Sequence, residues 1–135
     1  MTTTDTDTAV LDALRATRAG NVISASDERY EQARRVWNGS VDRRPLAVVQ
    51  CADRVQVAAT IAVARGRGLP LSVRGGGHSV VGFGTCDGGI VLDLGPMQEI
   101  RVDLDSSRAS AGGGCTSADC DARTQEFRVP RLTYT

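Results

Sequence analysis

The residues best suited to chemistry lie in one short stretch, from Arg74 to Ser79, with Gly82 three positions further on. Its three consecutive glycines permit positive φ angles and a close approach of the backbone to a ligand. Successive exposed N–H groups can bind an anion, and Arg74 either adds charge there or pairs with a carboxylate of the fold. His78, the only histidine of the chain, could act as a nucleophile through its neutral imidazole. The stretch therefore indicates either a phosphate cradle beside a reactive imidazole or a tight connection between strands.

The common phosphate-binding and nucleophile motifs do not fit this stretch. Gly75 and Gly77 match the first two glycines of a dinucleotide fingerprint, but Val80 occupies the place of the third and no helical pattern follows. The chain contains no lysine, which excludes a Walker loop and a Schiff base. Gly77-His78-Ser79 is also out of register with a nucleophile elbow.

Length and composition limit the classes of protein. The chain has 135 residues, which suits one domain or part of one, and its 16 basic residues, all arginine, balance 16 acidic ones. Such a balance gives no net attraction to nucleic acid or to an anionic membrane. With no apolar run of membrane length and no signal-peptide pattern at the start, we expect a cytoplasmic chain. Reduced thiols are then expected at all four cysteines: Cys51, Cys86, Cys115 and Cys120.

The elements that must position the glycine stretch follow from the apolar pattern. Strands are predicted over residues 45–51, 71–74 and 89–94. A helix is predicted between the first two, with Asp53 as its N-cap and Gln56 three residues on. Residues 45–74 therefore predict a parallel strand–helix–strand unit, with the glycine stretch at the end of its second strand.

The flanking segments are predicted more coarsely. Residues 1–7 are expected to be disordered, and a helix over residues 8–20 is predicted to end at Gly20. A short helix or turn follows and is expected to bury Tyr30 and Trp37. The arginine pairs in this region, at positions 34–35 and 43–44, are interpreted as solvated charge.

Beyond the third strand, the pattern predicts a hairpin and a final helix. Two strands should flank the turn Asp105-Ser106-Ser107. Thr116 and Asp119 have the spacing of a capping box, and the helix that they open should reach about Phe127.

The segment "RPLAVVQCADRVQVAATIAVARGRGLPLSVRGGGHSVVGFGTCDGGIVLDLGPMQEIRVD" resembles FAD-linked oxidases with a PCMH-type FAD-binding domain, in particular the berberine bridge enzyme-like group. The likeness runs from about Tyr30 to Phe127. It rests on the ordered set of strand, helix, R-G-G-G-H-S, C-D-G-G-I-V-L-D-L and A-G-G-G-x-T. The implied organisation is an N-terminal helical segment over 8–44, a partial FAD-binding domain over 45–127 and a tail, 128–135, that does not match.

The resemblance implies an α/β fold, the first lobe of the FAD domain, with a small and mainly parallel sheet flanked by helices. It implies that the loop Arg74–Ser79 and Gly82 bind FAD, and that His78 is bonded covalently to the flavin 8α-methyl carbon. It also implies transfer of a hydride from a small-molecule substrate to the flavin, with reoxidation by oxygen to give hydrogen peroxide.

The family's second lobe and substrate domain have no counterpart in this sequence, so a substrate is expected only in a complete enzyme. The sheet face that the second lobe would cover is expected to expose an apolar patch and to favour self-association. A catalytically inactive remnant or nucleotide-binding module is the alternative function.

Overall fold

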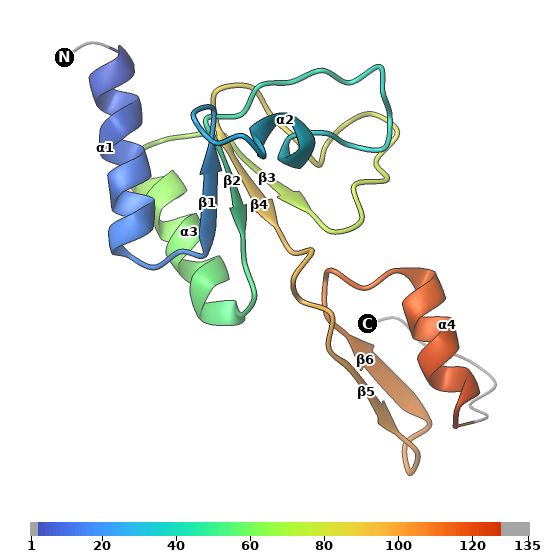
Figure 1. Ribbon diagram of the computed structural model, residues 1–135. Coiled ribbons are helices and arrows are strands. Elements are labelled where there is room, and N and C mark those ends of the chain that lie inside the picture. Colours follow the sequence, from blue (N-terminus) through green and yellow to red (C-terminus); the bar gives the residue numbers. More distant parts are fainter. Residues whose placement is uncertain (1–2, 128–135) are drawn as a thin grey trace.

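The computed structural model describes residues 3–127 and centres on a four-stranded sheet (Figure 1). Its strands are β1 (Asn21–Ser24), β2 (Ala47–Gln50), β4 (Ile90–Asp93) and β3 (Leu71–Arg74), in that spatial order. β4 is parallel to both of its neighbours, whereas β1 is antiparallel to β2. The predicted strand–helix–strand unit is present, but β4 is inserted between its two strands. The mainly parallel α/β sheet expected from the sequence is thereby confirmed.

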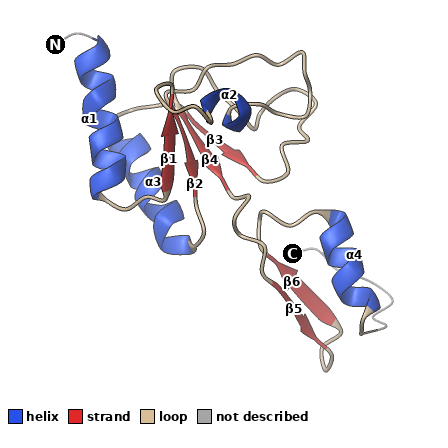
Figure 2. Ribbon diagram, viewed as in Figure 1, coloured by secondary structure: helices blue, strands red, loops and turns tan. Residues whose placement is uncertain are grey.

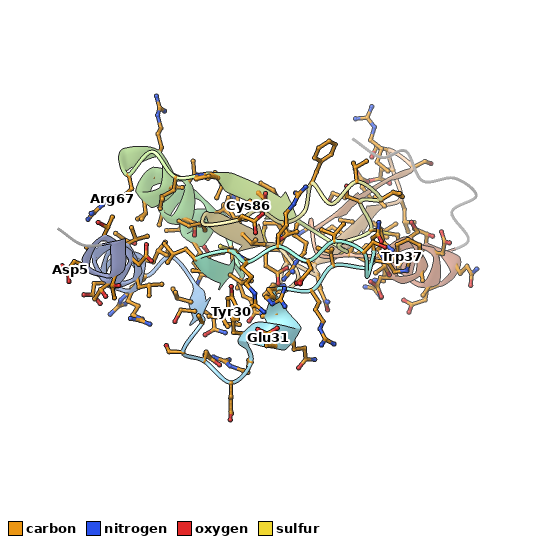
Figure 3. All side chains as sticks on the ribbon, turned by 90° about the horizontal axis from the view of Figure 1, so that it is seen from above. Asp5, Tyr30, Glu31, Trp37, Arg67 and Cys86 are labelled. Carbon is orange, nitrogen blue, oxygen red and sulfur yellow. The ribbon has the colours of Figure 1, made fainter. Side chains whose placement is uncertain are left out.

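Helices cover the sheet on both faces. Helices α1 (Thr3–Ala16) and α3 (Arg54–Gly66) lie on one face, and the single turn α2 (Tyr30–Ala33) lies on the other (Figures 2 and 3). Because side chains alternate along a strand, each central strand contributes to two cores. The α1/α3 core contains Val10, Leu14, Ala19, Ala47, Val49, Cys51, Val63, Ala64, Ile90 and Leu92. The α2 core contains Ile23, Tyr30, Val48 and Val91.

A hairpin and a helix form a separate unit beyond β4. Strands β5 (Ile100–Asp103) and β6 (Arg108–Ala111) pair antiparallel, and α4 (Ser117–Gln125) packs against β5. Figure 1 shows this unit displaced from the four-stranded sheet and joined to it by the segment after β4. The predicted turn lies between β5 and β6.

The helix starts agree with the capping patterns in the sequence. Asp53 Oδ1 accepts a hydrogen bond from Gln56 N at 2.9 Å at the start of α3. Thr116 and Asp119 form the reciprocal capping box that opens α4. These bonds satisfy N–H groups that have no partner within the helix.

The N-terminal region differs from the sequence-based expectation in three ways. Residues 3–7, where disorder was expected, form the first turns of α1, with Asp5 favourably placed near the positive end of the helix dipole. Strand β1, which was not predicted, pairs along one edge of the sheet. The helix also ends earlier than Gly20: Arg18 adopts the left-handed conformation at φ 52°, and Ala19 N donates to Leu14 O at 3.1 Å. This geometry is a Schellman cap with arginine where glycine is usual.

A buried ion pair joins the carboxyl ends of β3 and β4. Arg74 and Asp93 are register partners, and Arg74 Nη2 lies 2.8 Å from Asp93 Oδ2 with side chains 8% and 10% exposed. Both side chains point away from the α1/α3 core, as strand alternation requires. The pair therefore lies on the α2 side of the sheet.

Two further expectations concern cysteines and membrane spans. All four cysteines are free thiols, and burial raises the pKa of Cys51 and of Cys120. None of the helices within residues 3–127 has the length and apolarity needed to cross a membrane. The expected non-matching tail, 128–135, lies outside the described residues.

Arg18→Gly is expected to raise the free energy of unfolding by about 0.5–1 kcal/mol. The change removes the cost of about 1–2 kcal/mol that a residue with a Cβ has in the left-handed conformation. Against this, glycine loses more conformational entropy on folding, which costs about 0.5–1 kcal/mol. Urea denaturation measures the difference. The control Arg15→Gly, which lies within the right-handed part of α1, should lose about 1 kcal/mol. A loss of stability in both variants would contradict the cap assignment.

Asp93→Ala is expected to lower the free energy of unfolding by about 3–5 kcal/mol, because it leaves the Arg74 guanidinium buried without a counter-charge. Glu99→Ala, which breaks an ion pair whose side chains are 70% and 75% exposed, should cost less than about 1 kcal/mol. The double variant Arg74→Met/Asp93→Leu should recover most of the loss. Equal losses for the two single variants would show that burial of the pair is unimportant.

Candidate functional site

The glycine stretch opens the long connection between β3 and β4, residues 75–89, which we call the glycine loop. It is hydrogen-bonded along its length to the strap, residues 35–46, which links α2 to β2. The two segments run near each other at one end of the molecule in Figure 1, and the hydrogen bonds between them establish the contact.

The strap binds mainly the carbonyl groups of the glycine loop. Trp37 N donates to Gly77 O at 3.0 Å, and Asn38 Nδ2 donates to Val80 O at 2.7 Å. Arg43 Nη1 donates to the carbonyls of Gly82 and Thr85, both at 2.9 Å. Arg43 is therefore not solvated charge, as its sequence context indicated, but a half-buried link between strap and loop.

The amide groups in the first half of the same loop have no hydrogen-bond partner among the described residues. No N–H from Gly75 to Val81 donates a hydrogen bond to any other described residue. All seven residues of this segment are exposed or only partly buried. Three carbonyls of this segment, those of Gly77, Ser79 and Val80, accept hydrogen bonds, whereas none of its seven amides donates one to a described residue. The unpaired amides are available to an anion.

Each of the three consecutive glycines has its own structural reason. A Cβ on Gly75 would lie 2.5 Å from Gly113 O, so the loop packs closely on the second glycine run after β6. A Cβ on Gly76 would lie 3.0 Å from His78 Cδ2. Gly77 has a φ of 72°, which favours glycine. The sequence indicated positive φ angles and the approach of a ligand, but it did not reveal the contacts with Gly113 and His78.

Arg74 lies beneath the loop and not on its open side. Its guanidinium bonds Asp93 and also donates to Arg35 O at 3.0 Å. Its aliphatic chain lies close to the backbone of the loop: a Cβ on Gly77 would be 3.5 Å from Arg74 Cδ, and a Cβ on Gly84 would be 3.5 Å from Arg74 Cγ. Of the two roles that the sequence allowed for Arg74, the structure therefore gives it the pairing with a carboxylate.

The remaining predicted site residues lie on the same loop. His78 is exposed, and its imidazole is 6.0 Å from the indole of Trp37, centroid to centroid. Ser79 Oγ accepts a hydrogen bond from Phe83 N at 3.1 Å and so stabilises the turn. Gly82 is buried with a φ of 78°, and a Cβ there would lie 2.7 Å from Val41 Cγ1 of the strap.

Trp37 was expected to be a buried packing residue, and this prediction was wrong. Its side chain is 67% exposed, and Figure 3 shows it far from Asp5 of α1. The strap residues Trp37, Asn38 and Arg43 were missed as site residues because nothing in their local pattern relates them to a loop about forty positions away. Asp87 and Asp93 accept backbone hydrogen bonds from the N–H groups of Arg44 and Gly95.

Ion pairs fix the start of the strap. Arg34 bonds both Glu31 and Asp42, and hydrogen bonding to these carboxylates raises the pKa of Arg34 and lowers the pKa of Glu31 and Asp42.

Two cavities flank the strand ends. One, of about 350 Å³, is bordered by Arg29, Arg35, Gln50 and Arg74 on the α2 side. Another, of about 620 Å³, lies between the start of α3 and the hairpin.

Comparison with known proteins places this loop in a family. Residues 45–130 match the model of the FAD binding domain family. (R)-6-hydroxynicotine oxidase of Paenarthrobacter nicotinovorans is 38% identical over 84% of this chain, and FAD-linked oxidoreductase hasG of Aspergillus fumigatus is 38% identical over 80%. The chain spans 25% and 23% of the lengths of these two relatives.

Solved structures agree with the match. The crystal structure of 6-hydroxy-D-nicotine oxidase from Arthrobacter nicotinovorans aligns with a TM-score of 0.77 at 39% identity, covering 80% of this chain and 24% of that one. A variant of berberine bridge enzyme aligns at 19% identity with the same TM-score, over 87% of this chain and 26% of that one, and so shares the fold. The chain therefore belongs to the FAD binding domain family, and (R)-6-hydroxynicotine oxidase is among the proteins to which it is similar.

Proposed function

We propose that the glycine loop binds the diphosphate of FAD and that His78 forms a covalent bond to the flavin. The observation that carries the first part is the division of hydrogen bonds along the loop: the strap takes carbonyls, while the amides from Gly75 to Val81 stay free. A diphosphate accepts hydrogen bonds at every oxygen and donates none, so it complements such a surface.

Arg74 is proposed to act from below the loop and not as a phosphate ligand. Its charge is already compensated by Asp93 at 2.8 Å. The positive potential at the open side then comes mainly from backbone dipoles, which are fixed in place before the ligand arrives. Ser79 and Gly82 support the same shape through the turn that they form.

The covalent step is proposed on the exposure of His78 and on the family resemblance. A ring nitrogen forms a bond to the flavin 8α-methyl carbon; one proton leaves that carbon and one leaves the imidazole. FAD, if bound, would accept the two electrons that this bond formation releases, and dioxygen would take them up with two protons to give hydrogen peroxide. FAD, when bound, supplies the electrophilic carbon and the redox chemistry, whereas this chain supplies the nucleophile and holds it.

In the whole protein we propose the FAD-binding role of a flavin-dependent oxidase. A small-molecule substrate would transfer a hydride to the flavin, and oxygen would reoxidise it. The relatives named 6-hydroxynicotine oxidase support oxidation of a small organic molecule, although this chain matches only a quarter of their length. Exposed apolar side chains of the loop itself, among them Val80, Val81 and Phe83, are then available for the flavin or for self-association.

The single tryptophan makes FAD binding directly measurable. Titration with FAD should quench Trp37 emission, because the residue lies beside His78 and a bound flavin would be close enough to accept its excitation energy. Riboflavin, which lacks the diphosphate, should bind at least about tenfold more weakly, since it cannot use the amides. Equal affinities for FAD and riboflavin would contradict the phosphate role of the loop.

His78→Ala should abolish an acid-stable yellow adduct, measured by absorbance after precipitation in acid, while leaving the reversible quenching by FAD within a few-fold of the original. An adduct that survives in His78→Ala would assign the linkage to another residue. A chain that neither quenches nor becomes yellow would favour the non-enzymatic remnant.

A further inference from the structure

The imidazole of His78 makes no hydrogen bond with any side chain or backbone group among residues 3–127. Two neighbours lie close to the ring. The indole of Trp37 lies 6.0 Å away, with the ring planes inclined at 37°. On another side the ring lies over the bare backbone of Gly76, where a Cβ would be 3.0 Å from Cδ2 and 3.6 Å from Nε2.

Trp37 is itself held in place by the loop. Its backbone N–H donates to the carbonyl of Gly77 at 3.0 Å, and Gly77 is the residue between Gly76 and His78. The next residue, Asn38, bonds Val80 O at 2.7 Å. The backbone that carries the indole is thus fixed to the loop on both sides of His78, although the indole is 67% exposed. Burial in the core therefore does not account for the position of this side chain, whereas its contact with the imidazole does.

We propose that Trp37 and the bare backbone of Gly76 form a clamp that orients the His78 imidazole for attachment of the flavin. This inference rests on the proposed function. Trp37 is a positioning residue that acts through His78 in the bond-forming step described above. An unrestrained histidine has three staggered χ1 wells and two broad χ2 wells, so its ring would spend on the order of one sixth of its time in any one orientation. A clamp that selects the reactive orientation should raise the rate about fivefold.

The clamp predicts an effect on rate that is separable from an effect on binding. In Trp37→Ala, the rate constant for adduct formation at saturating FAD should fall about fivefold, whereas Trp37→Phe, which keeps an aromatic ring, should stay within about twofold of the original. Gly76→Ala should also slow attachment, because its methyl group would displace the ring. Val55→Ala, a change at an equally exposed residue on α3 away from the loop, should leave the rate unchanged. The adduct is followed by acid-stable absorbance, and thermal unfolding of each variant shows whether the fold is retained.

A second measurement tests the clamp without flavin. With one histidine and one tryptophan in the chain, NMR should show a nuclear Overhauser effect between indole and imidazole protons. The ring-current shift of the imidazole protons should disappear in Trp37→Ala and largely persist in Trp37→Phe.

The outcomes separate the two proposals. A wild-type chain that binds no FAD overturns the proposed function. A wild-type chain that is labelled at a rate unaffected by Trp37→Ala at saturating FAD overturns only the clamp. Absence of the indole–imidazole Overhauser effect overturns the clamp whatever the flavin result.

Discussion

The ion pair between Arg74 and Asp93 is the interaction on which the candidate site depends. It joins two parallel strands at their carboxyl ends, and the same guanidinium reaches the carbonyl of Arg35 in the strap. The side chain of Arg74 therefore contacts β4, the strap and the glycine loop. Such a pair contributes little net stability, because desolvation offsets most of the Coulombic attraction. Its value here is geometric: a planar guanidinium with several fixed donors holds three segments in one arrangement.

The glycine loop shows how a backbone can become receptive to an anion without a free cation. Every polar group of a loop must find a partner or remain in water. Here the strap donates to loop carbonyls through Trp37, Asn38 and Arg43, whereas the N–H groups from Gly75 to Val81 have no partner among the described residues. Gly75, Gly76 and Gly77 allow this arrangement for three different reasons, which are contact with Gly113, contact with His78 and a positive φ.

Four of the exposed apolar residues belong to the two segments that form this polar surface. Trp37, Val80, Val81 and Phe83 are all more than half exposed, and all lie on the strap or the glycine loop. A polar cradle bordered by apolar side chains suits a ligand with a charged diphosphate and a flat aromatic ring. The chain spans about a quarter of the relatives that it matches, so other parts of such proteins could complete the enclosure of the cofactor.

The sequence by itself determined the elements whose cause is local. The cap at Asp53, the capping box of Thr116 and Asp119 and the turn of the hairpin depend on residues within a few positions of one another, as do the strands of the parallel sheet. The ordered glycine motif also indicated the family. Only the tertiary structure decided the insertion of β4 between β2 and β3, the addition of β1, the pairing of Arg74 and the exposure of Trp37. These features depend on contacts between residues about twenty to forty positions apart, and no periodicity or spacing along the chain records which distant partners a segment will meet.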